Sequence, residues 1–147
     1  MIRQTLVVDA SVAIKWVVPE ADSSNAEALV GSYRLIAPQL IYAECANIVW
    51  KMMRRGELSG GEAMRATTVI DDFAVQTASM RELVPLSVDL SVRLDHAVYD
   101  CFYIALAQLE ECRLITADAR LHRKVQSLLR PDEARLCIML GDFDPAS

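Results

Sequence analysis

Thr5-Leu6-Val7-Val8-Asp9 is a short run of β-branched and apolar residues that ends in an aspartate. A second run, Leu114-Ile115-Thr116-Ala117, is followed in the same way by Asp118. Helical patterns follow both aspartates, and this alternation of strands and helices is typical of an α/β fold with a mostly parallel sheet. Ligands of such sheets bind beyond the carboxyl ends of the strands. Asp9 and Asp118 would therefore face one crevice if their strands are neighbours.

The rest of the chain continues this alternation. Ser59 and Glu62 have the spacing of a capping box, and Gly56 is typical of a helix end. Pro85 lies inside one predicted strand, which indicates an edge position. The pattern predicts helices at 11–18, 22–31, 39–55, 59–79, 87–94, 100–111 and 119–129, strands at 5–8, 35–37, 83–86, 113–116 and 136–140, and a tail at 141–147.

The size and composition indicate a chain with a sizeable core. At 147 residues and 16.3 kDa, residues 1–147 are predicted to form a single domain. Hydrophobic residues make up 53% and the mean hydropathy is +0.22. This excess suggests an apolar surface that a partner covers, and the helices at 39–55 and 59–79 are the candidates. No apolar stretch has the length of a membrane span, and no signal-peptide pattern is present, so a cytoplasmic location is expected.

Charge and cysteine content narrow the possible functions. The net charge of −5 argues against a general nucleic-acid-binding protein. Two basic tracts, Lys51–Arg55 and Arg120–Lys124, are candidates for a local rim that contacts RNA, although solvated helix ends explain them equally well. The four cysteines lack metal-ligand spacing, and His96 and His122 are isolated, which is typical of surface or packing residues. No glycine-rich phosphate loop is present.

Two further carboxylates lie in apolar helical segments. Glu44 is almost alone among polar residues between Gln39 and Lys51, in a helix that is predicted to be buried or in an interface. An ionised glutamate in that setting requires a cation or several hydrogen-bond donors. Asp100 opens the apolar run Cys101–Ala107, where an acid in the first helical turn is also explained by the helix dipole.

Gathered in one pocket, these four acids would form a site for a hard divalent cation. Like charges in proximity raise one another's pKa unless a cation neutralises them, and carboxylates suit Mg²⁺ or Mn²⁺. Helix capping is the competing explanation for Asp9 and Asp118, with Ser11 as an alternative cap for the first helix. The hydroxyls of Ser11 and Thr116 would hold water or a phosphate oxygen, or cap turns. The hypothesis is metal-dependent phosphodiester chemistry.

Five segments of the chain are similar to the motifs of a known family and occur in the same order. They are Val7-Val8-Asp9-Ala10-Ser11, Pro19-Glu20, Ala37-Pro38 leading to Glu44, the run from Tyr99 to Ala107, and the run from Leu114 to Arg120. With all four acids present, the chain resembles PIN-domain nucleases, specifically the VapC-type toxins of toxin–antitoxin pairs. The resemblance implies a Rossmann-like α/β/α sandwich with about five strands in the order 3-2-1-4-5.

The resemblance also implies an activity. It predicts a Mg²⁺- or Mn²⁺-dependent endoribonuclease that is a homodimer and is inhibited by a small antitoxin protein. Asp9 and Asp100 would bind the metal directly, with Asp118 beside them and Glu44 acting through water, while Ser11 and Thr116 would orient water or phosphate. The alternative is a PIN-like module that binds RNA or a partner without catalysis. A haloacid-dehalogenase-like phosphatase would need an aspartate at position 11, and a receiver domain would need an acidic pair after the first strand.

Overall fold

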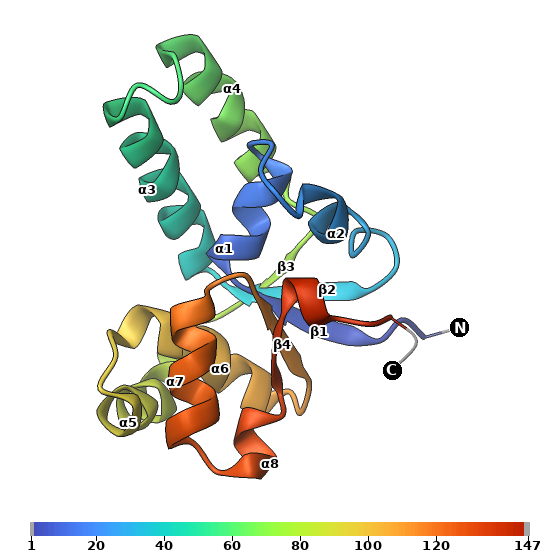
Figure 1. Cartoon of the computed structure of the whole chain (residues 1–147), viewed down its shortest axis with the longest axis vertical. Helices are drawn as coiled ribbons and strands as arrows, with labels where there is room; N and C mark the ends of the chain where they lie inside the picture. Colours follow the sequence, from blue (N-terminus) through green and yellow to red (C-terminus); the bar gives the residue numbers. More distant parts are fainter. Residues whose placement is uncertain (1, 146–147) are drawn as a thin grey trace.

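The computed structural model describes residues 2–145 and has a five-stranded parallel sheet at its centre (Figure 1). The strand order is β3-β2-β1-β4-β5, which confirms the predicted order. The strands are β1 (Thr5–Val8), β2 (Arg34–Pro38), β3 (Gln76–Ala78), β4 (Arg113–Thr116) and β5 (Cys137–Met139).

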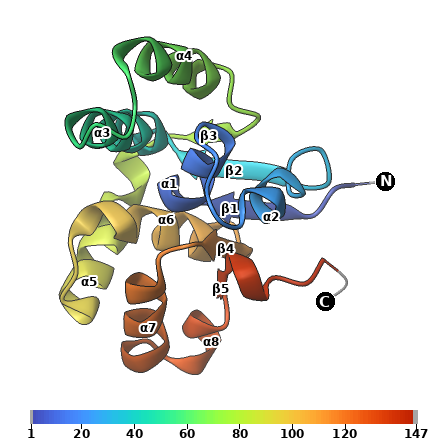
Figure 2. The same ribbon diagram turned by 45° about the horizontal axis from the view of Figure 1, so that its top comes forward.

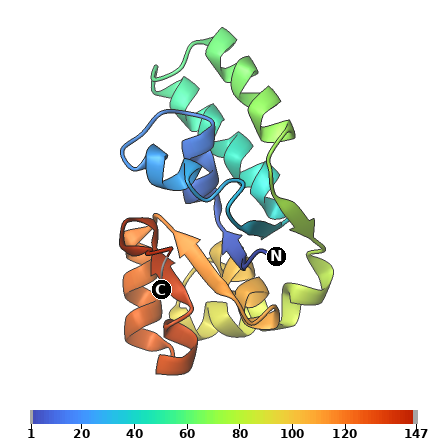
Figure 3. The ribbon, with the colours of Figure 1, turned by 90° about the vertical axis from the view of Figure 1, so that its right-hand side faces the viewer.

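The helices cover both faces of this sheet. Helices α1 to α4 lie on one side and α5 to α8 on the other, which gives three layers (Figures 1 and 3). This confirms the predicted α/β/α sandwich. The α-helices are α1 (Ala10–Ala13), α2 (Ser23–Glu27), α3 (Leu40–Arg54), α4 (Gly60–Asp71), α5 (Val84–Leu94), α6 (Val98–Leu109), α7 (Ala119–Leu128) and α8 (Pro131–Ala134), and short 3₁₀ helices span η1 (Ile14–Trp16), η2 (Arg81–Leu83) and η3 (Leu140–Asp142).

The central strand β1 determines which strand ends lie side by side. It pairs with β2 on one side and with β4 on the other, with Val8 opposite Ile115. Leu6, Val7 and Val8 have no exposed surface, because helices pack on both faces of the sheet. The register therefore brings the carboxyl ends of β1 and β4 together, as the crevice prediction required.

The strand predicted at 83–86 is wrong. Residues 81–83 form η2, and α5 begins at Val84, so that Pro85 lies in the first helical turn. A proline costs little there because its missing N–H would have no partner within the helix. The third strand is instead Gln76–Ala78, which pairs with Ile36–Pro38.

The helix predicted at 59–79 is correspondingly too long, since α4 ends at Asp71. Its start is confirmed: Ser59 and Glu62 form the reciprocal capping box. The apolar spacing continues past the end of α4 because Phe73 is also packed against the rest of the chain. Its ring lies edge-on to Trp16, with 5.6 Å between the ring centroids. The segments predicted as helices at 11–18 and 22–31 are shorter or divided, and α8 was not predicted.

The helical hairpin of α3 and α4 extends beyond the sheet, as Figure 2 shows from a second direction. Only Ile41, Cys45 and Val49 of α3 are buried, so of the two predicted settings, a buried helix or a helix in an interface, the first does not hold for the chain by itself. Its exposed apolar side chains leave an interface as the other possibility. None of the helices in residues 2–145 has the length and apolar character needed to cross a membrane.

Candidate active site

Asp9 lies where β1 ends, and its carboxyl is nearly buried, with 5% of the residue exposed. Its Oδ1 accepts hydrogen bonds from the Val12 amide at 3.2 Å and from the Ser11 hydroxyl at 2.5 Å. Its Oδ2 accepts from the Thr116 hydroxyl at 2.5 Å, across from β4. Asp9 is therefore the N-cap of α1 and also the contact between the ends of the two central strands.

Ser11 and Thr116 are tied to the loop after β4 as well as to Asp9. The Ser11 Oγ accepts from the Ala117 amide at 2.8 Å, and the Thr116 Oγ1 accepts from the Asp118 amide at 3.0 Å. The two hydroxyl oxygens are 3.4 Å apart. Both hydroxyl groups thus donate to Asp9 while their oxygens hold the β4 loop, which orients the Asp9 carboxyl.

The surroundings of Asp9 disfavour its charge. Burial raises the pKa of the Asp9 carboxyl to about 7, although the hydrogen bonds from Ser11 and Thr116 oppose that change. The negative charge of Asp100 raises it further. The carboxyl of Asp9 would therefore be only partly ionised at neutral pH. A cation beside it would favour the charged form, so this position suits a metal ligand.

Glu44 lies in the first half of α3. Its Oε1 and the Tyr103 hydroxyl are both buried, and neither has a partner with the geometry of a hydrogen bond among residues 2–145. The two groups still interact: burial raises the pKa of Glu44, the Tyr103 hydroxyl lowers it, and the charge of Asp100 raises it. An unpaired buried carboxylate oxygen is costly unless another group binds it.

Asp100 lies in the first turn of α6, and its Oδ2 is 2.6 Å from the His96 Nε2. The turn that carries His96 is held from two sides: the Ser91 hydroxyl donates to the His96 carbonyl at 2.5 Å, and the Lys124 ammonium donates to the Asp95 carbonyl at 2.6 Å. The interpretation of His96 as an isolated surface or packing residue is therefore wrong. In the sequence, the spacing of four residues between His96 and Asp100 is the signal for this pair.

Asp118 forms the N-cap of α7. Its Oδ1 accepts from the amides of Arg120 and Leu121 at 3.0 and 3.1 Å. The capping explanation is therefore confirmed for Asp118, as it is for Asp9. The two carboxyls still share a neighbourhood, because both Asp9 and Asp118 raise the pKa of the Cys137 thiol, which burial already raises to about 12.

The residues present suit a hard divalent cation in chemistry. Asp9, Glu44 and Asp100 supply oxygen ligands, and the charge of Asp100 acts on both of the others. Within residues 2–145, however, no three His, Cys, Asp or Glu side chains lie together in an arrangement that could hold a metal ion. The orphaned Glu44 Oε1 and the mutual repulsion are the features that a bound cation would relieve.

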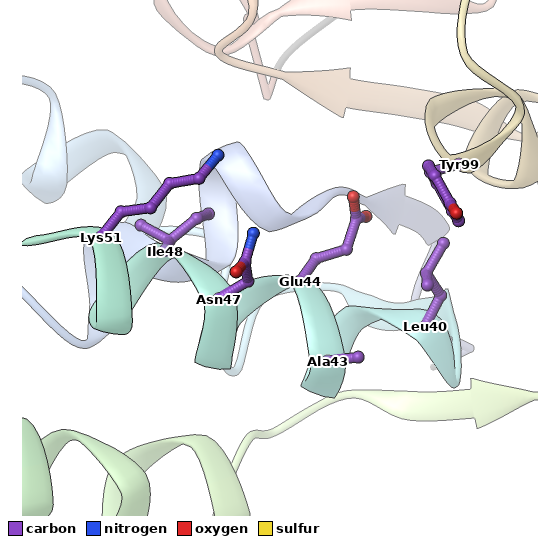
Figure 4. Close-up of a pocket in the computed structure, with 7 residues that line it drawn as sticks. All are labelled: Leu40, Ala43, Glu44, Asn47, Ile48, Lys51 and Tyr99. Carbon is purple, nitrogen blue, oxygen red and sulfur yellow. The ribbon is translucent and has the colours of Figure 1, made fainter.

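A pocket of about 300 Å³ opens beside Glu44 (Figure 4). The Glu44 carboxyl extends from α3 on the same side as Asn47 and Lys51, and Tyr99 of α6 lies across from it. The pocket is lined by Leu40, Ala43, Glu44, Asn47, Ile48, Lys51 and Tyr99. A ligand in this pocket would contact Glu44 and lie next to α6, the helix that carries Asp100.

This fold corresponds to a known class. The PIN domain model matches residues 6–126, and the chain belongs to the PIN-domain family. Among curated relatives, Ribonuclease VapC3 of Pyrobaculum aerophilum is 35% identical over 86% of this chain and 98% of its own length. Ribonuclease VapC9 of Mycobacterium tuberculosis is 30% identical over 79% of this chain and 87% of its own length.

Solved structures agree on the fold. The crystal structure of PAE2754 from Pyrobaculum aerophilum superposes with a TM-score of 0.70 at 19% identity and covers 94% of this chain and 90% of that chain. The crystal structure of Mycobacterium tuberculosis VapC20, named as a toxin that cleaves the sarcin-ricin loop, has a TM-score of 0.60 at 16% identity, with 78% and 90% covered.

Proposed function

We propose that this chain is a metal-dependent endoribonuclease and the toxin of a toxin–antitoxin pair. The observation that carries the proposal is the buried Oε1 of Glu44, which lies in the field of Asp100, the same carboxylate whose charge acts on the nearly buried Asp9. Relatives that are 30–35% identical over most of the chain are named ribonucleases, which supports RNA as the substrate. We further propose that residues 1–147 form a single PIN domain.

Mg²⁺ or Mn²⁺ is the proposed cofactor, since PIN-domain ribonucleases are generally metal-dependent. Asp9 and Asp100 would hold the ion directly, Asp118 would lie beside them through the oxygen that does not cap α7, and Glu44 would act through water. The ion would supply the Lewis acid that activates water and neutralises charge on the phosphodiester. Ser11 and Thr116 would position Asp9, because both of their hydroxyls donate to it.

The decisive test is cleavage of RNA with and without a divalent ion. We expect Mg²⁺- or Mn²⁺-dependent cleavage that EDTA abolishes, and a loss of roughly 100-fold or more in Asp9→Asn and Asp100→Asn, because each removes a charged ligand. Asp71→Asn, at an exposed position of α4, is the matched control and should cleave like the parent. Full activity in both site variants would reject the assignment. RNA binding without any turnover would instead favour the non-catalytic module.

The proposed partners are RNA, a small antitoxin and a second copy of this chain, and the proposed location is the cytoplasm. Two solved structures of similar fold are named as a toxin–antitoxin complex from Klebsiella pneumoniae and as VapBC2 from Rickettsia felis bound to a DNA fragment. Exposed apolar side chains on α3 and α4, such as Met53 at 41% and Met64 at 68%, are the proposed contacts. Light scattering that shows a monomer, with no small protein co-purifying from the adjacent gene, would contradict this assembly.

A further inference from the structure

One side of α3 carries a continuous row of polar side chains that starts at the candidate site. Glu44, Asn47, Lys51 and Arg54 are spaced by three, four and three residues, which places them on one face of a helix. Figure 4 shows Glu44, Asn47 and Lys51 extending from α3 on the same side. These four residues, called here the α3 row, lead from the acidic site to a basic helix end.

A second pocket of about 310 Å³ lies at that basic end, lined by Trp50, Lys51, Arg54 and Arg55. Lys51 lines both this pocket and the one beside Glu44, so the two pockets adjoin along the helix. Trp50 is 47% exposed, and the Arg54 guanidinium lies 5.1 Å from its ring centroid. The result is an open aromatic and cationic platform at the surface.

The charge of this platform is local and opposite to that of the chain. Residues 50–55 contain three basic residues and no acid, in a chain with a net charge of −5. Within residues 2–145, the one ion pair formed by these three is the exposed contact of Arg55 with Glu57 at 4.0 Å. Lys51 and Arg54 are therefore available to an anionic ligand.

We infer that single-stranded RNA lies along the α3 row, with its backbone on Lys51 and Arg54 and one base stacked on the Trp50–Arg54 platform. Cationic grooves with exposed aromatic rings, on which bases stack, are the usual means of holding single strands. Arg54 lies ten residues beyond Glu44 on α3, about 15 Å along the helix, which spans roughly four stacked nucleotides. Tyr99, 59% exposed across the pocket from Glu44, offers a ring at the other end. The inference rests on the proposed function for the identity of the strand.

The first experiment measures the salt dependence of RNA binding in the full chain. A fluorescein-labelled 12-nucleotide single-stranded RNA is titrated in EDTA with the parent, with Lys51→Gln/Arg54→Gln, and with Arg3→Gln/Arg34→Gln. The control pair removes the same charge from two exposed residues at the amino ends of the strands: Arg3 lies just before β1, and Arg34 is the first residue of β2. For single strands, each lost phosphate contact lowers the slope of log K against log salt by about 0.7, so the α3 double variant should lose about 1.4 and the control nothing.

The second experiment uses the fluorescence of the exposed tryptophan. The chain has two tryptophans, and Trp16 is half-buried with its Nε1 bonded to the Ala26 carbonyl at 2.9 Å. Addition of the RNA should quench the parent's fluorescence, and Trp50→Phe should lose the quenching while keeping most of the affinity. Trp50→Ala should weaken binding roughly 5- to 100-fold, which is the loss of one stacked base.

Cleavage assays on the same variants separate this inference from the proposed function. If the parent cleaves RNA, and the α3 variants keep its KM, its salt slope and its quenching, the RNA path is overturned and the enzyme assignment stands. If the parent binds RNA with the expected slope and quenching but never cleaves it, the path stands and the proposed function fails. A rise in KM at unchanged kcat in the α3 variants supports both.

Discussion

At the scale of single residues, Asp9 combines a structural and a chemical role. It caps α1, accepts two hydroxyl hydrogen bonds, and lies beside the charge of Asp100. Burial excludes water from its carboxyl and raises its pKa to about 7, although the hydrogen bonds that orient the carboxyl oppose this rise. A buried carboxyl that costs stability when ionised, at the end of a central strand, suits a role in binding a cation.

This pKa predicts how the metal-free protein responds to pH. Because the folded state binds the Asp9 proton more tightly than the unfolded state, whose pKa is near 3.8, the Asp9 contribution is full below about pH 4 and is lost as pH rises to about 7. The loss is at most about 4 kcal/mol. Urea unfolding in EDTA of the parent and of Asp9→Asn should show their stability difference falling over this range. A difference that is constant with pH would contradict the prediction.

His96 is expected to position Asp100. Its ring nitrogen contacts one carboxyl oxygen, while Ser91 and Lys124 hold its turn in place. Partners that orient ligating carboxylates typically change metal affinity 10- to 100-fold, so His96→Ala should weaken Mn²⁺ binding by about that factor. Calorimetric titration with Mn²⁺ measures this without reference to activity, and His96→Gln should recover part of the affinity. His122→Ala removes the chain's other histidine, and an equal effect there would argue against a specific role.

At the scale of elements, an ion-pair network joins three helices on one side of the sheet. Arg93 of α5 donates to both oxygens of Glu133 in α8, at 3.0 and 2.5 Å, and Gln108 of α6 donates to the same carboxyl at 3.0 Å. Glu133 is 8% exposed. Because α6 carries Asp100 and α5 leads into the His96 turn, this network supports the acidic site from behind.

Removing the arginine should leave a nearly buried carboxylate without its partner. Arg93→Met is expected to cost about 2 kcal/mol, less than a fully buried pair because Arg93 is partly exposed, and a double-mutant cycle with Glu133→Gln should give a coupling of about 1 kcal/mol. The pKa of Glu133 is lowered, chiefly by Arg93, so the effect should be present above pH 4.5 and disappear as Glu133 is protonated at lower pH. Arg55→Met breaks an exposed pair and should cost under about 0.5 kcal/mol in the same urea titrations.

Elements with strong local signals were predictable and those defined by their neighbours were not. The central strands, the capping box at Ser59 and the helix that ends before Gly56 follow from periodicity and turn residues. The segment Gln76–Ala78 has little strand character of its own and becomes a strand because β2 presents unpaired backbone groups to it. Residues 83–86 look like a strand, but Leu83 ends η2 and α5 begins at Val84, where Pro85 is tolerated in the first turn.

At the scale of the whole molecule, a bound cation should stabilise the fold. An ion that binds only the folded state adds RT ln(1 + [L]/Kd), or about 2.7 kcal/mol at 100 times its Kd. Urea unfolding in Mn²⁺ should therefore move to higher urea than in EDTA for the parent and for Asp71→Asn. In Asp9→Asn the shift should be small. An unchanged midpoint in saturating Mn²⁺ would show that the carboxylates do not form a metal site.

The pattern of the sequence determines the α/β class and the four candidate acids, with their positions at strand ends or in apolar helices. It does so because periodicity, capping and turn preferences act over a few residues. The fold alone sets the environment of those acids. The hydrogen bond from Thr116 to Asp9 spans 107 residues, the buried Glu44 oxygen lies beside a pocket that α3 and Tyr99 of α6 line together, and the turn that carries His96 is held by Lys124 of α7. Burial and long-range contacts depend on how the layers pack, and they determine which carboxyls lose water and which find a partner.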